Sequence, residues 1–216
     1  MTDLKRYYAQ RAREYERIYD KPERQPDLEW LKQALPPMFA GRRVLEIACG
    51  TGYWTQFIVR EANGIVGIDV NDETLEIARG KGLPAERVAF RIADAYAPPE
   101  DLGEFGGAFA GFWWSHVPIR ERRRFFQGLD RRLAPGARVA LLDNLYVEGS
   151  STPISRRDAE GNSFQARRLE DGSQHEVLKN FPTGAELDAD IEGLGQNPRF
   201  TALQYYWLFT YEKPAG

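Results

Sequence analysis

The sequence predicts a doubly wound α/β domain on a mostly parallel sheet, and three observations lead to this fold class. Short apolar runs of strand length alternate with helical patterns from residue 44 to residue 144. Several runs, such as residues 65–70, are apolar at nearly every position, as strands buried on both faces require. Residues 44–55 read as strand, Gly-rich turn and helix, an arrangement in which backbone N–H groups and the helix dipole face a ligand.

Composition limits the class of protein. The chain has 216 residues, 42% hydrophobic and 28% charged, which suits one globular domain over residues 1–216. No apolar run approaches a bilayer span and the first residues form no secretory signal, so we expect a cytoplasmic protein with no membrane partner. One cysteine and two histidines argue against a disulfide framework and a metal site. The net charge of −3 argues against nucleic acid as a partner.

Residues 1–36 are expected to form an N-terminal helical lid. Residues 4–20 place tyrosines along one face of an amphipathic helix, which suits either an ordinary core stripe or a cover over a polar ligand. Pro22 and Pro26 mark the loop that follows. Asp27 is the expected N-cap of a short second helix, which Pro36-Pro37 is expected to stop.

The middle of the chain supplies the predicted sheet. Helices are expected over residues 53–61, from the cap Asn71 to Gly80, and over the Arg-rich segment that opens at 115–118 and ends at 133–136. Between them, strands are expected at residues 44–47, 65–70, 88–92, 107–114 and 137–144.

Residues 145–182 depart from this alternation and are expected to form a loop and a hairpin near the substrate. Asp171-Gly172 separates two runs of strand type and is a hairpin signal. Thr183 and Glu186 form a capping box for a further helix. Residues 200–211 are expected to form one long aromatic strand, and this strand and the hairpin suggest a possible homodimer.

Three acids stand in register at three successive strands. Glu46 lies within the first strand, Asp69 ends the second and Asp94 ends the third. Ligands of open α/β sheets bind at the carboxyl ends of the strands. An acid at the end of the second strand suits the ribose hydroxyls of a nucleoside, and Asp94 suits an exocyclic amine of a base. Each acid alone equally suits a helix cap or a turn, but the three together predict a nucleoside site.

Over residues 40–145 the chain resembles the class I S-adenosylmethionine-dependent methyltransferases. Residues 46–52 resemble the first motif of that family, Asp69 its ribose-binding acid, and residues 93–95 its adenine-contacting motif. Residues 133–137 resemble its Leu-x-Pro-Gly-Gly turn. Ala48 stands where glycine is usual, and its methyl group is expected to reduce cofactor affinity.

This resemblance implies a seven-stranded sheet, S-adenosylmethionine as the cofactor and S-adenosylhomocysteine as its product. The cofactor-binding residues that it implies are Tyr8, Tyr15, Glu46, Ala48, Gly50, Gly52, Trp54, Asp69, Val70, Asp94, Ala95 and Trp113.

A narrower resemblance, to small-molecule O-methyltransferases of the dehydrophos type, extends to both termini. Those enzymes act on a phosphonate oxygen. The similar segments lie at residues 7–15, 50–55, 116–118 and 169–181. The resemblance implies that the N-terminal helix closes over the cofactor, with Tyr7 and Arg11 near the substrate. The acceptor is then a small molecule that is methylated on an oxygen of a carboxylate, a phosphonate or a hydroxyl.

Residues near the fourth strand and on the hairpin are the candidates for the acceptor side. Trp113 and Trp114 point to opposite sides of a strand, so we assign Trp113 to a cation–π contact with the sulfonium and Trp114 to the core. His116 is the candidate base for a hydroxyl acceptor, or else a helix-end residue held by the backbone. An ionised acceptor needs no base, and Arg167 and Lys179 would then hold it. Solvent-exposed positions equally suit Arg168 and Lys179.

Two other functions remain open. A nucleotide-dependent oxidoreductase shares the strand, the glycines and the ribose acid, but no third glycine follows Gly52 at the spacing Gly-x-Gly-x-x-Gly. A non-catalytic module on the same fold would bind the cofactor without turning over an acceptor. Nucleic-acid methylation is disfavoured because the chain has no Asn/Asp-Pro-Pro-aromatic motif and no extended basic tail.

Overall fold

The computed structural model describes residues 15–168 and 172–215. Tyr7, Tyr8 and Arg11, which the sequence assigns to the cofactor and the substrate, lie outside this part of the chain. Of Tyr15 only the backbone is described.

A seven-stranded sheet forms the centre of the molecule, in the order β3-β2-β1-β4-β5-β10-β9. The strands β1 to β5 pair in parallel, whereas β10 is antiparallel to both of its neighbours. This confirms the predicted fold class. The strand order reverses between β1 and β4, the point where ligands of such sheets bind. The strands are β1 (Arg43–Ile47), β2 (Gly64–Asp69), β3 (Val88–Ile92), β4 (Phe105–Gly111), β5 (Leu133–Asn144), β9 (Gln196–Ala202) and β10 (Tyr206–Glu212).

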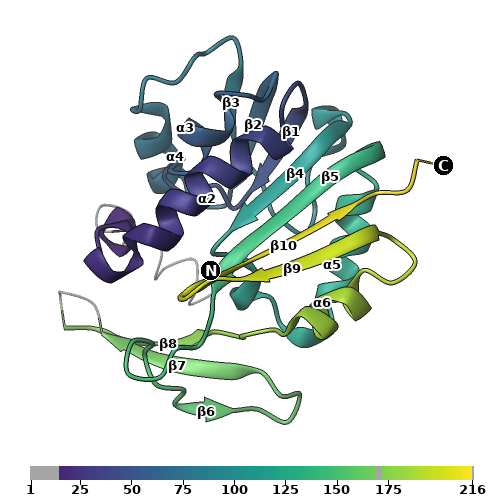
Figure 1. Cartoon of the computed structure of the whole chain (residues 1–216). Coiled ribbons are helices and arrows are strands. Elements are labelled where there is room, and N and C mark those ends of the chain that lie inside the picture. Colours follow the sequence, from purple (N-terminus) through teal and green to yellow (C-terminus); the bar gives the residue numbers. More distant parts are fainter. Residues whose placement is uncertain (1–14, 169–171, 216) are drawn as a thin grey trace.

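Helices cover both faces of this sheet (Figure 1). The leucines of α2 and Ile58 of α3 bury against Val44 and Phe109 on one face. Phe125 of α5 and Leu187 of α6 bury against the other face, while α4 packs beside β2 and β3. The α-helices are α2 (Gln25–Met38), α3 (Thr55–Ile58), α4 (Asp72–Arg79), α5 (Arg122–Asp130) and α6 (Gly184–Asp190). Short 3₁₀ helices are η1 (Tyr15–Tyr19), η2 (Pro22–Arg24), η3 (Glu100–Leu102), η4 (Trp114–His116) and η5 (Ile119–Glu121).

A separate three-stranded sheet lies beside the edge at which the parallel strands end (Figure 1). Its strands are β6 (Arg156–Arg157), β7 (Ser163–Arg168) and β8 (Gln174–Leu178), all antiparallel. β7 and β8 form the hairpin expected around Asp171-Gly172, although residues 169–171 of its turn are outside the described residues.

The prediction of one strand over residues 200–211 is wrong. The chain turns at residues 203–205, where the Leu203 N–H donates to the Tyr206 carbonyl at 2.8 Å, and β9 and β10 pair as a hairpin. The turn, Leu203-Gln204-Tyr205, has no glycine, proline or asparagine. The residues that usually signal a turn are therefore missing.

The second helix begins earlier and ends later than predicted. α2 starts at Gln25, two residues before Asp27, so Asp27 does not cap it. The Asp27 carboxylate is buried and accepts a hydrogen bond from the Tyr205 N–H at 2.7 Å. Pro36 and Pro37 lie inside the last turn of α2. Burial of Leu35, Pro36 and Phe39 offsets the backbone hydrogen bonds that the prolines cannot donate.

Three further boundaries and one helix cap differ from the sequence prediction. The helix after the Gly-rich turn is only four residues long, Thr55–Ile58. The Asn71 side chain makes no capping hydrogen bond to α4. The Arg-rich helix ends at Asp130, so residues 133–136 already belong to β5. The fourth strand ends at Gly111, because Phe112 has a positive φ of 59°, and Trp114 therefore lies in η4.

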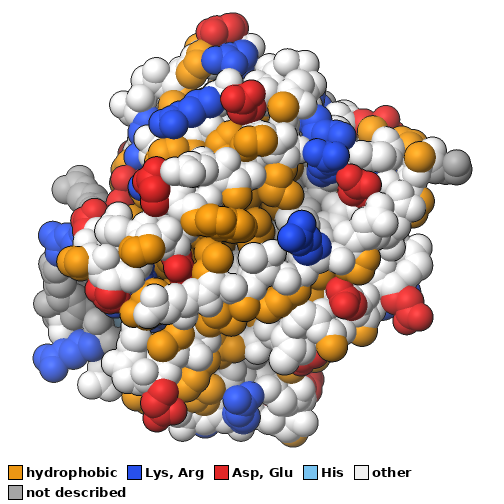
Figure 2. Space-filling model, viewed as in Figure 1, with side chains coloured by type: hydrophobic (Ala, Val, Ile, Leu, Met, Phe, Trp, Pro, Cys, Tyr) orange, Lys and Arg blue, Asp and Glu red, His pale blue; other side chains and the backbone are white. Residues whose placement is uncertain are grey.

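Figure 2 shows the face that α2 covers, with hydrophobic side chains gathered in its middle and most charged side chains around its margin. Among the described residues, no helix has the length and apolar character needed to cross a membrane. The same residues contain no group of three or more His, Cys, Asp or Glu side chains placed to hold a metal ion.

Candidate active site

The carboxyl ends of β1, β2 and β3 bring the predicted cofactor residues to one edge of the sheet. Asp69 ends β2 and is 9% exposed. Its two carboxylate oxygens accept hydrogen bonds from the Gly50 N–H at 3.0 Å and the Asn71 N–H at 2.9 Å. Burial raises the pKa of Asp69, and these backbone N–H groups oppose the rise. A carboxylate has about four lone-pair positions, so Asp69 can still accept from ligand hydroxyls.

The Gly-rich turn after β1 has a backbone that favours glycine at three positions. Ala48, Gly50 and Gly52 have φ values of 49°, 54° and 71°. A Cβ on Gly52 would meet Ala78 at 3.1 Å and Phe90 at 3.3 Å, so Gly52 allows close packing within the protein. A Cβ on Gly50 would meet no atom within 4 Å. Gly50 is thus the position at which a ligand can approach the backbone most closely.

Glu46 lies inside β1 with only 2% of its surface exposed. Its carboxyl oxygen Oε2 accepts a hydrogen bond from the Thr55 hydroxyl at 2.5 Å. Burial raises the pKa of Glu46 to about 8, against the lowering effect of Thr55. Glu46 therefore links β1 to the start of α3, and a cationic group of a ligand nearby would favour its ionised form.

Trp54 follows the turn as a core residue, and its contact with the cofactor stays a prediction. Its ring is 3% exposed and packs edge-on to Phe109 and Tyr19, in the core beneath α2. The sequence did not distinguish this core role from a cofactor contact, because the residue directly follows the turn.

The described end of the N-terminal segment contacts the Gly-rich turn directly. Tyr19 stacks on Tyr53, with ring centroids 3.6 Å apart. Glu16 accepts a hydrogen bond from the Thr51 hydroxyl at 2.6 Å and pairs with Lys81 at 2.7 Å. These contacts hold η1 against the turn, a position that suits a lid.

The end of β3 provides the rest of the predicted cofactor side. Asp94 accepts from the Tyr96 N–H at 2.9 Å, and Ala95 is buried beside it. Trp113 is partly buried and packs against Tyr96 at 5.5 Å, whereas Trp114 is fully buried as predicted.

The sequence analysis missed one exposed apolar side chain at this edge. Ile92 lies on β3 and pairs in register with Asp69 of β2, the residue directly before Val70. Ile92 is 57% exposed. An exposed isoleucine beside the predicted ribose acid, Asp69, offers an apolar surface against which a base could pack. The alternation of apolar residues in β3 gave no sign of its exposure.

The acceptor side begins with a buried ion pair. The Lys179 ammonium donates to Asp143 Oδ1 at 2.9 Å and to the Ser115 hydroxyl at 2.6 Å, and both charged groups are almost fully buried. Burial would raise the pKa of Asp143, but Lys179 and the hydrogen bonds it receives lower it overall. Lys179 thus ties the hairpin to η4 and to the end of β5, and the alternative of a solvent-exposed Lys179 is wrong. Sequence reasoning gave Asp143 and Ser115 no role.

His116 lies beside this pair and is buried. Its Nδ1 is 2.7 Å from the Leu178 carbonyl oxygen, so Nδ1 carries the proton and donates. Burial and the nearby Lys179 lower the pKa of His116 well below its usual range. The imidazole is therefore neutral at pH 7 and is a weak base in this environment.

Arg167 projects from β7 and donates to Gln165 Oε1 at 2.8 Å. Its charge contributes to the lowered pKa of both Lys179 and His116, so it lies within electrostatic reach of them. Arg167, Lys179 and His116 thus lie near one another, while their roles toward an acceptor stay predictions.

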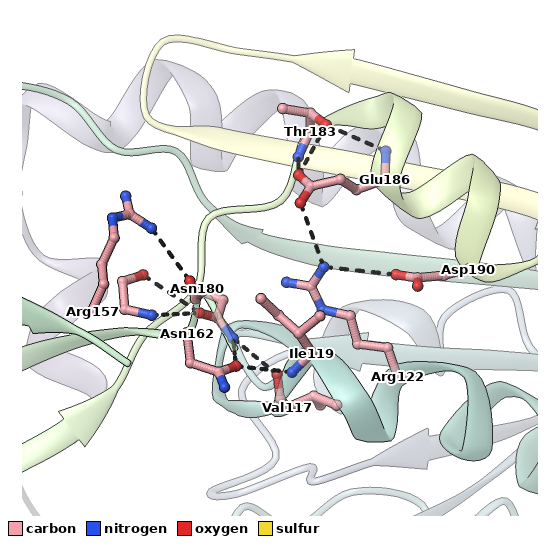
Figure 3. Close-up of polar contacts among 11 residues, drawn as sticks. Val117, Ile119, Arg122, Arg157, Asn162, Asn180, Thr183, Glu186 and Asp190 are labelled. Atoms are coloured by element: carbon pink, nitrogen blue, oxygen red, sulfur yellow. Dashed lines mark hydrogen bonds and ion pairs between the residues drawn. The ribbon is translucent and has the colours of Figure 1, made fainter. Parts of the chain in front are cut away.

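Two buried asparagines anchor the hairpin to η4 and η5 (Figure 3). Asn180 donates to the Val117 carbonyl and to Asn162 Oδ1, each at 3.1 Å. Asn162 Oδ1 also accepts from the Ile119 N–H at 2.9 Å. On the far side, Arg122 of α5 reaches Glu186 and Asp190 of α6 at 4.0 and 3.9 Å.

Comparison with known proteins identifies the fold unit that carries this site. Residues 44–136 match the family model described as a methyltransferase domain. This part of the chain is therefore similar to a methyltransferase domain. The whole chain is 26% identical to DhpI in the DhpI–SAH complex, with a TM-score of 0.77 over 98% of this chain and 96% of that chain. The DhpI–SAM–HEP complex gives the same identity and a TM-score of 0.76.

Curated relatives match a shorter region. Methyltransferase GfsG of Streptomyces halstedii is 32% identical over 56% of this chain and 44% of its own length. O-methyltransferase rstn1 of Aspergillus nomiae is 30% identical over 62% of this chain and 64% of its own length. The chain thus spans about half to two thirds of the length of these relatives.

These similarities agree with the predicted family and with its cofactor, S-adenosylmethionine, since the two DhpI structures are complexes with SAH and with SAM. The edge described above fits that cofactor, because Gly50 leaves room at the backbone and Asp69 retains acceptor capacity at the end of β2. The oxidoreductase alternative is not favoured. Contacts of individual residues with the cofactor, those of Glu46, Ala48, Val70, Asp94, Ala95 and Trp113 among them, stay predictions.

Proposed function

We propose that the protein transfers the methyl group of S-adenosylmethionine to an already ionised oxygen of a small anionic acceptor, a carboxylate or a phosphonate. The observation that carries this proposal is the acceptor side of the site, where Arg167 and Lys179 lie near a histidine that is neutral and buried. Positive charge favours an anion there, and the histidine is too weak a base to ionise an alcohol.

The chain's own residues would bind and orient the two reactants. When bound, the cofactor supplies an electrophilic methyl group on a sulfonium. Asp69 and the Gly50 backbone would hold its nucleoside end, and Trp113 would face the sulfonium. Methyl transfer depends mainly on holding nucleophile and methyl group in line, so the acceptor residues act chiefly by position.

Arg167 is the residue best suited to bind the oxyanion of the acceptor. A guanidinium offers a fork of N–H donors that matches a carboxylate or a phosphonate. Lys179 has three N–H donors, and the bonds to Ser115 and Asp143 use two of them. We assign the third to the acceptor, with Asp143 keeping the ammonium in place.

A methyl-transfer assay by mass spectrometry tests the proposal. Acceptors of matched skeleton, such as propanoate, propylphosphonate and propan-1-ol, are offered with S-adenosylmethionine. We expect methyl esters of the acids and no ether from the alcohol. Methylation of the alcohol alone would contradict an ionised acceptor, and cofactor binding with no turnover of any acceptor would favour the non-catalytic module.

The variant His116→Asn separates positioning from base catalysis. Asparagine keeps an N–H donor for the Leu178 carbonyl but has no basic nitrogen. With an ionised acceptor we expect the rate to fall less than about tenfold, whereas loss of a general base costs about 10²–10⁴-fold. The larger loss would restore His116 to the role of catalytic base.

The remaining expectations about partners rest on composition. The aromatic side chains of β10 that suggested a homodimer are buried in the chain's own core, so they give a dimer no support. We infer a small-molecule partner, no nucleic acid and a cytoplasmic location. Light scattering at micromolar concentration would show a dimer if one forms by another surface.

A further inference from the structure

Arg24 is a buried arginine at the same edge of the sheet that sequence reasoning did not single out. It ends η2, directly before α2, and its side chain is 8% exposed. The guanidinium donates to Asn144 Oδ1 and to the Ser150 hydroxyl, each at 3.2 Å. It also lies over the rings of Tyr205 and Tyr206, at 5.0 and 5.4 Å from their centroids.

Within residues 15–168 and 172–215, no acid balances the charge of Arg24, because no carboxylate lies within the 4.0 Å of an ion pair. Its hydrogen-bond partners there, Asn144, Ser150 and the Tyr206 hydroxyl, are all neutral oxygens. In the same residues, Nε of Arg24 is buried without a hydrogen-bond acceptor. Burying an uncompensated charge is costly, so a buried arginine normally has an anionic partner.

The other buried cations of the described chain follow that rule. Lys179 pairs with Asp143 at 2.9 Å, and Arg122 has Glu186 and Asp190 at about 4 Å. Arg24 is the exception among the three.

A chain of hydrogen bonds connects Arg24 to the acceptor side. Asn144 accepts from Arg24 and donates through Nδ2 to Asp143 Oδ1 at 3.0 Å. The same Asp143 oxygen binds the Lys179 ammonium. The charge of Arg24 also contributes to the lowered pKa of Lys179, so the two cations influence each other.

We propose that Arg24 is a specificity-determining residue that binds an oxyanion of the methyl acceptor, in a deepening of the function proposed above and resting on it. The guanidinium has five N–H donors; Asn144, Ser150 and the Tyr206 hydroxyl accept from it, and Nε–H has no acceptor among the described residues. The unused donors, Nε–H among them, supply the contacts that an oxyanion needs. Asn144 and the two tyrosine rings hold the guanidinium in place, and the anion balances its charge.

Binding of ethylphosphonate, a probe anion, tests this assignment without relying on turnover. The anion is titrated into protein saturated with S-adenosylhomocysteine, and its affinity is followed by ³¹P line broadening. Arg24→Gln removes the charge, and Arg24→Lys keeps the charge but loses the planar guanidinium that can donate two parallel hydrogen bonds. Arg43→Gln is the matched control, since Arg43 also lies over an aromatic ring and donates to a neutral oxygen, but at the opposite end of β1.

We expect Arg24→Gln to weaken ethylphosphonate binding about tenfold or more, and Arg24→Lys to weaken it less. Arg43→Gln and the affinity of all variants for S-adenosylhomocysteine stay as in the unmodified protein. Because the buried charge is unbalanced without an anion, the ligand-free Arg24→Gln variant keeps or gains thermal stability.

Three results would overturn the assignment. If Arg24→Gln or Arg24→Lys loses thermal stability while its ethylphosphonate affinity is unchanged, Arg24 only ties η2 to β5. If a variant keeps both its ethylphosphonate affinity and its thermal stability, Arg24 is likewise excluded as a residue that binds the acceptor. If the unmodified protein binds S-adenosylhomocysteine but no anion, the failure lies with the proposed function, and the Arg24 proposal falls with it.

Discussion

At the end of β1 the backbone passes from an extended strand into the Gly-rich turn, and Ala48 makes that change with a φ of 49°. The left-handed region costs an L-residue with a Cβ about 1–2 kcal/mol, against a smaller entropic cost for glycine. We expect Ala48→Gly to stabilise the ligand-free protein by about 0.5–1 kcal/mol, measured by urea unfolding. The control is Ala189→Gly, at an exposed position inside α6, which should lower stability by a similar amount. Destabilisation by Ala48→Gly would show that the alanine methyl group contributes packing that outweighs the strain.

Glu46 makes stability depend on pH in a direction that can be worked out. Its pKa is raised from 4.5 to about 8 in the folded protein, so the folded state keeps a proton that the unfolded state releases. The stabilising contribution is complete below pH 4.5 and is lost as the pH rises through about 8. We expect the unmodified protein to lose a few kcal/mol relative to Glu46→Gln between pH 5 and pH 8, by urea unfolding at each pH.

Comparison with Glu46→Gln isolates this effect from that of His116. The lowered pKa of His116 acts in the opposite sense, because it removes stability as the pH falls below 6.5, and it is present in both proteins. The exposed variant Glu61→Gln should leave the pH dependence unaltered. If the free energies of unfolding of the unmodified protein and of Glu46→Gln change in parallel between pH 5 and pH 8, the Glu46 carboxyl is already ionised in the folded protein.

The sequence identified residues whose role is local and missed those whose role depends on distant partners. Gly50 and Asp69 belong to a strand–turn–strand pattern with fixed spacing, and their contact at 3.0 Å follows from it. Arg24 and Asp143 acquire their significance only from partners far along the chain, such as Asn144 for the first and Lys179 for the second. No periodicity or motif in the sequence indicates that these residues, far apart along the chain, are in contact.

Among the elements, the β7–β8 hairpin depends on a small polar anchor for its position. Asn180 gives two hydrogen bonds and accepts one from the Ser163 N–H at 2.9 Å, all of them buried. Asn180→Ala would leave the Val117 carbonyl and the Ser163 N–H without partners. We expect it to cost about 1–3 kcal/mol of unfolding free energy. Asn63→Ala, which removes an exposed amide that donates to the Gly41 carbonyl, should cost less than about 1 kcal/mol.

The same variant tests whether the hairpin forms the acceptor side. Because Arg167 and Lys179 lie on or beside the hairpin, a loosened anchor should weaken acceptor binding and leave the affinity for S-adenosylhomocysteine unchanged. An equal loss of both affinities would place the effect in the whole fold and contradict a separate role for the hairpin.

Element boundaries were predicted well where a specific side chain sets them and poorly where packing sets them. The capping box of Thr183 and Glu186 starts α6 as expected. By contrast, α2 runs through Pro36-Pro37 and the last aromatic segment folds back at residues 203–205. In both places burial against the sheet outweighs the local preference of the residues.

At the scale of the whole molecule, alternation of strands and helices was enough for the fold class but not for the strand order. The number of strands came from the family resemblance, and the antiparallel direction of β10 was not predicted, because pairing between β5 and β10 joins segments about 70 residues apart in sequence. The order matters for function, since it brings the start of β10, the end of β5 and η2 together around Arg24.

Binding of the cofactor product should stabilise the entire fold, and this separates the methyltransferase from its oxidoreductase alternative. A ligand that binds only the folded state at 100 times its dissociation constant adds about 2.7 kcal/mol. For a chain of 216 residues this corresponds to a rise in Tm of about 5–10 °C. We expect S-adenosylhomocysteine to produce this rise in a thermal-unfolding titration, and NAD at the same concentration to produce none.

Gly50→Ala should reduce the rise in Tm, because its new Cβ meets no protein atom within 4 Å but projects where the cofactor approaches. Stabilisation by NAD alone would contradict the assignment of this edge to S-adenosylmethionine, and an undiminished rise in Gly50→Ala would remove Gly50 from the binding surface.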